Sequence, residues 1–322
     1  VTIAPSHRMD SIKEYYFSKK NREIAELRKA GRDIISLGIG SPDMPPAQAV
    51  IDRLAKEAQR PDVHAYQPYN GSELLRKAYA DWYEKWYNVK LDPKSEVLPL
   101  LGSKEGIVHI CMAFLDEGDK VLVPNPGYPT YRAAVTLAGG EVLEYRLNAA
   151  NGFYPNFEEI EKEDLSKVKL MFVNYPNMPT GTHPTVELFE KLVEFAGKHN
   201  ILLVHDNPYS FVRNNLQLSI LAIPGAKDVA IEMNSTSKGH SMAGWRVGVV
   251  AGRADIISDI LRFKSSVFKP FYIKILPEAC RTAREHAPVV FLHYLDRTRL
   301  VKGRDSGEDI IAHKGGHSAR AT

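Results

Sequence analysis

The chain alternates between two patterns of apolar and polar residues. Short runs of apolar, often β-branched residues end in loops rich in Gly, Pro and Asn, which is typical of buried strands. Longer stretches carry apolar residues every three or four positions, which is typical of helices with one buried face. The predicted strands cover residues 33–37, 98–101, 120–124, 141–147, 169–173, 201–205 and 228–233. The predicted helices cover residues 10–30, 50–59, 73–87, 107–115 and 186–199, and a further helix starts at residue 156.

The order of these elements indicates an α/β fold. Strands that alternate with helices favour a mostly parallel sheet with helices on both faces. In such sheets ligands bind beyond the carboxyl ends of the strands. Tyr128, Asn177, Asp206 and Lys238 each follow soon after the last apolar residue of a predicted strand. We therefore expect these side chains to meet at one edge of the sheet and to form the functional site.

Lys238 lies in a segment of small and hydroxylated residues, 233–248, and Arg246 follows eight positions later. A neighbouring cation and partial burial both disfavour a charged lysine, so they lower its pKa. A neutral amine of this kind can form a Schiff base with a carbonyl group. The alternative is that Lys238 and Arg246 are ordinary surface cations.

Two further loops carry groups that suit a phosphorylated, flat ligand. Gly102, Ser103 and Lys104 precede the helix predicted at 107–115. Free backbone N–H groups, a hydroxyl and an ammonium at a helix N-terminus suit a phosphate, although a plain capped helix start fits this segment as well. Tyr128 lies in a stiff loop rich in Pro and Gly, where its ring could stack on a flat ligand.

Composition and charge narrow the function classes. The chain has 322 residues and a formal net charge of +3, which argues against a nucleic acid or an anionic membrane as partner. Cys111 and Cys280 form neither a disulfide framework nor a metal pattern, and His313 and His317 have no third ligand nearby, so no metal site is predicted. No apolar run reaches about 18 residues and no secretion signal is recognisable, so we expect a cytoplasmic protein.

Several motifs follow one another in a characteristic order. They are Pro179-Thr180-Gly181, Asp206-x-x-Tyr209, Ser235-Thr236-Ser237-Lys238 and Gly244-Trp245-Arg246-Val247-Gly248. As an ordered set they resemble the fold-type I, class I/II pyridoxal-phosphate aminotransferases, from about Ile34 to Gly252. The resemblance implies an α/β fold-type I PLP-dependent transferase with a mostly parallel, seven-stranded type of sheet in a large domain, residues 46–250. Residues 1–45 and 251–322 would form a smaller α/β domain.

The resemblance also implies catalytic roles for three residues. Lys238 resembles the lysine that binds pyridoxal 5'-phosphate covalently and moves the substrate's α-proton. Asp206 resembles the carboxylate that pairs with the pyridine nitrogen, where a fixed anion keeps that nitrogen protonated and the ring electron-withdrawing. Tyr209 resembles the tyrosine whose hydroxyl contacts the cofactor's phenolic oxygen.

Other residues are implied to bind the cofactor or the substrate. The expected phosphate ligands are Ser103, Lys104, Ser235 and Arg246, the residue stacked on the ring is Tyr128, and Asn177 is a further cofactor ligand. Tyr66 resembles a tyrosine that reaches the partner subunit's phosphate, which implies a homodimer with shared sites. Gly40 matches a glycine beside the substrate. Arg320 is the candidate for binding the substrate's α-carboxylate with its guanidinium fork, and the alternative is a solvated arginine in a tail.

The sequence departs from the family pattern in two places. The family's asparagine directly before Pro-Thr-Gly is replaced by Met178, which cannot donate the hydrogen bond that the asparagine gives to the phenolic oxygen. Asn177 could take over this role through a shift of one residue. After Val267 the chain resembles the family only in fragments, as though loops were missing.

The implied activity is a two-stage, ping-pong transfer of the amino group of an L-amino acid to a 2-oxo acid, by analogy 2-oxoglutarate. The residues before and within 33–38 are similar to the aspartate and LL-diaminopimelate aminotransferase branches, which indicates a polar or dicarboxylic donor. One alternative is a PLP-dependent carbon–sulfur β-lyase on the same fold. The other is a non-catalytic PLP-binding regulatory module, against which the lack of a basic helix-turn-helix before Asp10 counts.

Overall fold

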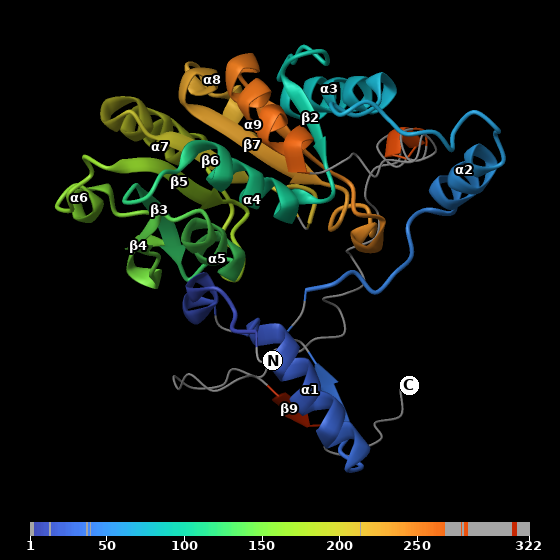
Figure 1. The fold of residues 1–322 in the computed structure, drawn as a ribbon, viewed down its shortest axis with the longest axis horizontal. Coiled ribbons are helices and arrows are strands. Elements are labelled where there is room, and N and C mark those ends of the chain that lie inside the picture. Colours follow the sequence, from blue (N-terminus) through green and yellow to red (C-terminus); the bar gives the residue numbers. More distant parts are fainter. Residues whose placement is uncertain are drawn as a thin grey trace, which may run out of the picture. The chain divides into compact units, whose positions relative to one another are not determined.

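The computed structural model describes residues 3–12, 14–36, 38, 40–212, 214–267, 278, 280–282 and 311–313. The chain divides into two compact units, one of residues Val1–Ser41 with Asp296–Thr322, and one of residues Pro42–Leu295. The larger unit contains a seven-stranded sheet with the strand order β2-β8-β7-β6-β5-β3-β4 (Figure 1). Its strands are β2 (Val97–Leu100), β3 (Lys120–Asn125), β4 (Glu141–Arg146), β5 (Val168–Asn174), β6 (Leu202–Asp206), β7 (Ala230–Ser235) and β8 (Gly248–Gly252).

The sheet is mostly parallel, as the sequence predicted. Strands β4, β3, β5, β6 and β7 are paired in parallel, and β8 runs antiparallel to both of its neighbours, β7 and β2. The helices of this unit are α2 (Gln48–Ala58), α3 (Glu73–Tyr87), α4 (Ser103–Phe114), α5 (Pro129–Leu137), α6 (Phe157–Ile160), α7 (Val186–His199), α8 (Ala226–Val229) and α9 (Ala254–Val267). Some of these helices pack on one face of the sheet and some on the other.

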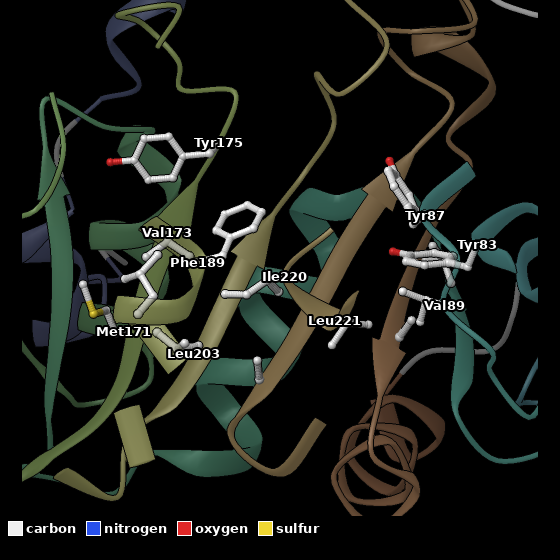
Figure 2. Close-up of a cluster of buried hydrophobic side chains, with 14 of the residues drawn as sticks. Tyr83, Tyr87, Val89, Met171, Val173, Tyr175, Phe189, Leu203, Ile220 and Leu221 are labelled. Carbon is white, nitrogen blue, oxygen red and sulfur yellow. The ribbon is translucent and has the colours of Figure 1, made fainter. Parts of the chain in front are cut away.

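Alternating apolar residues along the strands build a separate core on each face. On β5, Met171 and Val173 belong to one core, and Leu170 and Phe172 belong to the other. Figure 2 shows the first core, in which side chains of α3 and α7, such as Tyr83 and Phe189, lie on the same side of the strands. Apolar residues of α4, α5 and α9 fill the second core. Burial on both faces explains why these strands are almost continuously apolar.

Several elements differ from the sequence-based prediction, and strand β8 and helix α9 were not predicted at all. Helix α5 was missed, because Pro129 followed a Pro- and Gly-rich loop and suggested a longer loop, whereas proline is well suited to the first turn of a helix. Helix α4 begins at Ser103 rather than at residue 107. Strand β7 begins at Ala230, because the preceding residues form the short helix α8 after Gly225, which has a positive φ of 78°.

The smaller unit is described by itself. Its elements are the 3-10 helix η1 (His7–Ser11), α1 (Tyr16–Lys29), β1 (Ile34–Ser36) and β9 (Ile311–His313), and β1 pairs antiparallel with β9. The guanidinium of Arg28 on α1 donates to the carbonyl oxygen of Ile34 at 2.9 Å, which ties the helix to the strand.

The boundaries predicted for the two domains, 46–250 against 1–45 with 251–322, stay a prediction. Helix α9, which follows residue 250, packs on α4 and β8 of the larger unit. Within the residues that the structure describes, no helix is long and apolar enough to cross a membrane.

Candidate active site

The parallel sheet brings the ends of distant chain segments to one edge. Strands β5, β6 and β7 end there at Asn174, Asp206 and Ser235. Strand β8 starts at the same edge, because Gly248 lies opposite both Ser235 and Leu100 in the register of the sheet. Residues just before β8 and just after β2 therefore lie beside the ends of the parallel strands, as expected for a binding site in an α/β sheet.

A cavity of about 260 Å³ lies at this edge. It brings together eight side chains that the sequence analysis selected, namely Ser103, Lys104, Tyr128, Asp206, Tyr209, Ser235, Lys238 and Arg246. The remaining lining residues are Tyr131, Asn174, Met178, Pro208, Ser237 and Ala243. The cavity thus combines aromatic rings, hydroxyl groups, cations and one carboxylate.

Asp206 is the buried anion of the cavity. The hydroxyl of Tyr131 donates to its Oδ2 at 2.8 Å, and the amide of Asn174 donates to its backbone oxygen at 2.7 Å. Burial raises the pKa of Asp206 to about 6, although the Tyr131 hydrogen bond acts in the opposite direction. Its Oδ1 is buried, and no donor among the described residues reaches it. This oxygen is therefore available to accept a hydrogen bond from a ligand.

A buried pair lies beside Asp206. Its neighbour His205 points to the other face of the sheet, as consecutive strand residues do, where its Nδ1 lies 2.8 Å from Oε2 of Glu232. The His205 Nε2 lies 2.9 Å from the Tyr175 carbonyl oxygen and must donate to it, since a carbonyl can only accept. These contacts link β6 to β7 and to the residue that follows β5.

Lys238 and Tyr209 have side chains whose ionisation the cavity shifts. Lys238 is half-buried, and burial together with the charge of Arg246 lowers its pKa below the ordinary lysine value. Burial and the charge of Asp206 raise the pKa of Tyr209, which keeps its hydroxyl protonated. The cavity therefore presents a lysine that loses its proton more easily than a free lysine, together with a hydroxyl that can donate.

An anion-binding end is formed by the start of α4 and by Arg246. Gly102, the N-cap of α4, has a φ of 80°, and a Cβ at this position would collide with the Arg246 guanidinium. A Cβ on Gly248 would lie 2.9 Å from the backbone nitrogen of Ser103. The two glycines thus allow the helix N-terminus and Arg246 to approach closely. Free N–H groups and a guanidinium at a helix N-terminus suit a phosphate.

The residues around Met178 are arranged differently from the sequence expectation. Asn177 does not line the cavity, because its side-chain oxygen accepts from the Thr180 hydroxyl at 2.8 Å and stabilises the turn. Met178 lines the cavity, and its N–H donates to the Asn174 side-chain oxygen at 2.8 Å. At this end of β5 the structure therefore places Asn174, rather than Asn177, beside Asp206.

The structure does not test the roles predicted for three other residues. Tyr66 is 83% exposed, and Gly40 belongs to the smaller unit. Arg320 lies outside the described residues. The roles predicted for them stay predictions.

Tyr131 and Asn174 are site residues that the sequence analysis missed. Asn174 is the last residue of β5, so the rule that selected Asp206 would also have selected it. Tyr131 lies on the first turn of α5, three residues after Tyr128, and helical spacing would have turned both toward the same side. The sequence analysis missed Tyr131 because it did not predict helix α5.

The residues present fit pyridoxal phosphate. The buried Oδ1 of Asp206, which accepts from no described donor, suits a donor such as a protonated ring nitrogen. Lys238 and Arg246 line the same cavity. The Lys238 amine can react with a carbonyl group, and the Arg246 guanidinium can bind a phosphate. Among the described residues, no group of His, Cys, Asp and Glu is arranged to hold a metal ion.

Comparisons with known proteins agree with this arrangement. The model of the family described as "Aminotransferase class I and II" matches residues 32–292. LL-diaminopimelate aminotransferase from Moorella thermoacetica is 46% identical over 264 residues, which are 81% of this chain and 68% of that protein. The enzyme of the same name from Aquifex aeolicus is 40% identical over 264 residues, with the same coverage of both chains.

Solved structures give the same fold. Substrate-bound BacF from Bacillus subtilis superposes with a TM-score of 0.84 at 36% identity, over 89% of this chain and 73% of that chain. Thermus thermophilus aspartate aminotransferase with maleate superposes with a TM-score of 0.79 at 26% identity, over 88% and 72%. The predicted fold class is confirmed.

Proposed function

Because this chain belongs to the class I and II aminotransferases, we propose that its amino donor is LL-diaminopimelate and that its acceptor is 2-oxoglutarate. The family transfers amino groups to 2-oxo acids and depends on pyridoxal phosphate. The proposed donor rests on relatives of that name, which are 40–46% identical to this chain. The similarity of residues 33–38 to the same branch supports it.

Pyridoxal phosphate supplies a carbonyl that condenses with amines and a ring that withdraws electrons. The backbone N–H groups at the start of α4, with Ser103, Lys104, Ser235 and Arg246, would bind its phosphate. Asp206 would accept a hydrogen bond from the ring nitrogen at Oδ1. The pKa of Asp206 is about 6, and a cationic partner at Oδ1 would stabilise the ionised carboxylate further.

Lys238 would hold the cofactor and then act as the base for the α-proton. An amine is a nucleophile and a base only when it has lost its proton, and both burial and Arg246 favour that loss. Tyr209 would donate its hydroxyl hydrogen to the phenolic oxygen, and Tyr128 would stack on the ring. The Met178 side chain offers no donor, whereas Asn174 and Tyr209, which line the same cavity, carry polar groups.

The observation that carries the proposal is the shared cavity of Lys238 and Asp206. A lysine with a lowered pKa and a buried carboxylate oxygen that accepts from no described donor face the same space. The site therefore offers one group to bind the cofactor's carbonyl carbon and another to bind its ring nitrogen.

We further propose a homodimer with shared sites. Tyr66 is 83% exposed in the single chain, so its ring is accessible to a partner subunit. Its predicted role is to reach the phosphate in the partner's site. Cys111 and Cys280 are both buried, which suits a reducing, cytoplasmic location that we also propose. Gly40 and Arg320 remain the proposed substrate residues of the small domain.

The test is an absorbance spectrum of the PLP-loaded protein before and after single amino acids are added without any oxo acid. A donor converts the cofactor to its pyridoxamine form, so the visible band disappears and a band in the near ultraviolet replaces it. We expect LL-diaminopimelate to do this at lower concentration than aspartate, alanine or aromatic amino acids.

Other results would contradict the proposal. A stronger response to a different amino acid would overturn the proposed donor and keep the amino transfer. A visible band that persists while pyruvate and ammonia accumulate would indicate the β-lyase alternative. A control with the Lys238→Ala variant should give no half-reaction with any donor.

A further inference from the structure

The loop that enters α4 is held on both sides by side chains. Oε2 of Glu105 accepts a hydrogen bond from the Leu101 N–H at 2.5 Å. Nη2 of Arg246 donates to the Leu101 carbonyl oxygen at 3.1 Å. Leu101, the residue before the N-cap Gly102, is thus held through both its N–H and its carbonyl group. Ser103 and Lys104, which line the cavity, follow directly.

Glu105 occupies the helix position from which a side chain can reach back to the residues before the helix. In many helices the N-cap side chain accepts from a backbone N–H of the first turn, while a Glu at the third helical position reaches back to the N-cap region. Gly102 has no side chain, and Glu105 is the third residue of α4. Glu105 reaches back to Leu101, and the N–H groups of the first turn stay available to a ligand.

A carboxylate in this place carries a cost, because it lies in the same helix turn as the anion-binding end. Lys264 of α9 lies against it, with Nζ 3.7 Å from Oε1 of Glu105, and the Lys264 side chain is 1% exposed. Nε2 of His109 lies 3.0 Å from the same oxygen. Two groups of cationic or donor character therefore face this one carboxylate.

The electrostatics keep Glu105 ionised. Burial acts to raise its pKa, but His109, the charge of Lys264 and the Leu101 N–H together hold the pKa below the ordinary value. Burial lowers the pKa of Lys264, and Glu105 opposes this effect. Each charge is thus stabilised by the other in a place where water is excluded.

We propose that Lys264 neutralises Glu105, so that Glu105 can hold the Leu101 N–H without repelling the phosphate bound at the start of α4. Both are positioning residues, since neither lines the cavity. The inference rests on the proposed phosphate site and deepens it. It assigns a function in cofactor binding to a buried lysine on a helix that contributes no residue to the cavity.

The alternative is an ion pair that stabilises the packing of α9 on α4 and does nothing else. The two can be separated by comparing pyridoxal phosphate with pyridoxal, which has the same ring and carbonyl but no phosphate. A defect in the packing of α9 that leaves the start of α4 in place weakens the binding of both compounds equally, and a defect that moves α4 is not repaired when the Glu105 charge is removed. An uncompensated Glu105 carboxylate weakens the binding of the phosphorylated compound selectively.

The experiment measures the dissociation constants of both compounds by absorbance titration of the cofactor-free full chain. For Lys264→Met we expect pyridoxal phosphate to bind about tenfold more weakly and pyridoxal to change by less than about twofold, as an uncompensated charge one helix turn away implies. Glu105→Gln in the Lys264→Met background removes the repelling charge and should restore most of the loss. Glu105→Gln alone should keep or increase the preference for the phosphorylated compound.

The matched control is Lys227→Met, which removes a lysine whose Nζ lies 3.0 Å from Glu96, away from the cavity. It should leave the preference for the phosphorylated compound unchanged. Equal losses for both compounds in Lys264→Met, or no rescue by Glu105→Gln, would overturn this inference while the wild type still binds pyridoxal phosphate. A wild type that binds no pyridoxal phosphate would instead overturn the proposed site, and this inference with it.

Discussion

Asp206 shows how a single residue can favour function at the expense of stability. One carboxylate oxygen is hydrogen-bonded to Tyr131, and the other is buried with no donor among the described residues. An ionised carboxylate in this position costs free energy in the cofactor-free protein. The pKa of about 6 expresses that cost, since the proton is held more tightly than in the unfolded chain.

The first prediction concerns Asp206→Asn in the cofactor-free protein. Because the folded-state pKa is raised, the wild type loses stability as the pH rises from about 4 to about 6, and the loss is complete above that range. The neutral amide avoids this loss. We expect the variant to be about 1–3 kcal/mol more stable than the wild type at pH 8, and to lose this advantage at pH 4.

Urea denaturation at both pH values measures this difference. The same variant should be at least about 100-fold slower in the half-reaction, because a preorganised charge is lost. A variant that is less stable than the wild type at pH 8, or an advantage that does not depend on pH, would contradict the account of Asp206.

At the scale of elements, the site depends on how closely α4 approaches β8. Gly248 is the first residue of β8, and a Cβ there would lie 2.9 Å from both the Gly102 carbonyl carbon and the Ser103 nitrogen. These atoms are backbone and cannot turn aside as a flexible side chain would. The start of α4 would have to move away from Arg246.

The second prediction is that Gly248→Ala destabilises the protein by about 1–3 kcal/mol, as overpacking does, and weakens the binding of pyridoxal phosphate more than that of pyridoxal. The control is Gly197→Ala on the exposed face of α7, where a Cβ has no atom within 4 Å. It should stabilise the protein by about 0.5–1 kcal/mol and leave binding unchanged. Denaturation curves and titrations measure both. Equal behaviour of the two variants would show that the close approach is unimportant.

The sequence predicted those site residues that follow from the direction of a strand. Asp206 and Lys238 were selected because they follow apolar runs, and parallel strands bring such ends together. Asn177 was selected by the same rule, but β5 ends earlier, at Asn174, and the Asn177 side chain accepts from Thr180 instead. A polar side chain that the sequence pattern predicts to contact a ligand can instead form hydrogen bonds within its own turn.

Contacts between helices could not be predicted in the same way. Lys264 lies far from Glu105 in the sequence, and nothing in the amphipathic pattern of α9 distinguishes a buried lysine from an exposed one. Tyr131 on the missed helix α5 was not predicted for a related reason. Its hydroxyl donates to Asp206, which lies on a different element, β6. Such pairs depend on tertiary packing, which the periodicity of one segment does not contain.

At the scale of the whole molecule, the proposed homodimer makes each site depend on two chains. Lys238 lines the cavity of its own chain, whereas the exposed Tyr66 is proposed to serve the partner. The third prediction is that Tyr66→Phe and Lys238→Ala proteins, each impaired alone, recover activity when they are unfolded together and refolded. In a symmetric dimer with random pairing, half of the dimers are hybrids with one intact site, so we expect about a quarter of the wild-type activity.

The matched control mixes Lys238→Ala with Asp206→Asn, because both residues line the same cavity and act in one chain. A hybrid of these two contains no intact site, because each chain keeps its own defect in its own cavity, so its recovery should remain at the background level. Equal recovery in both mixtures, or none in the first, would contradict shared sites.

The central claim is that Lys238 holds the cofactor, and it can be tested directly. The protein is loaded with pyridoxal phosphate, reduced with borohydride to make the lysine linkage permanent, digested, and mapped by mass spectrometry. The account predicts one modified peptide, with the pyridoxyl group on the lysine of Ser235-Thr236-Ser237-Lys238. Modification of another lysine, such as Lys104 in the same cavity, or no incorporation at all, would contradict the account.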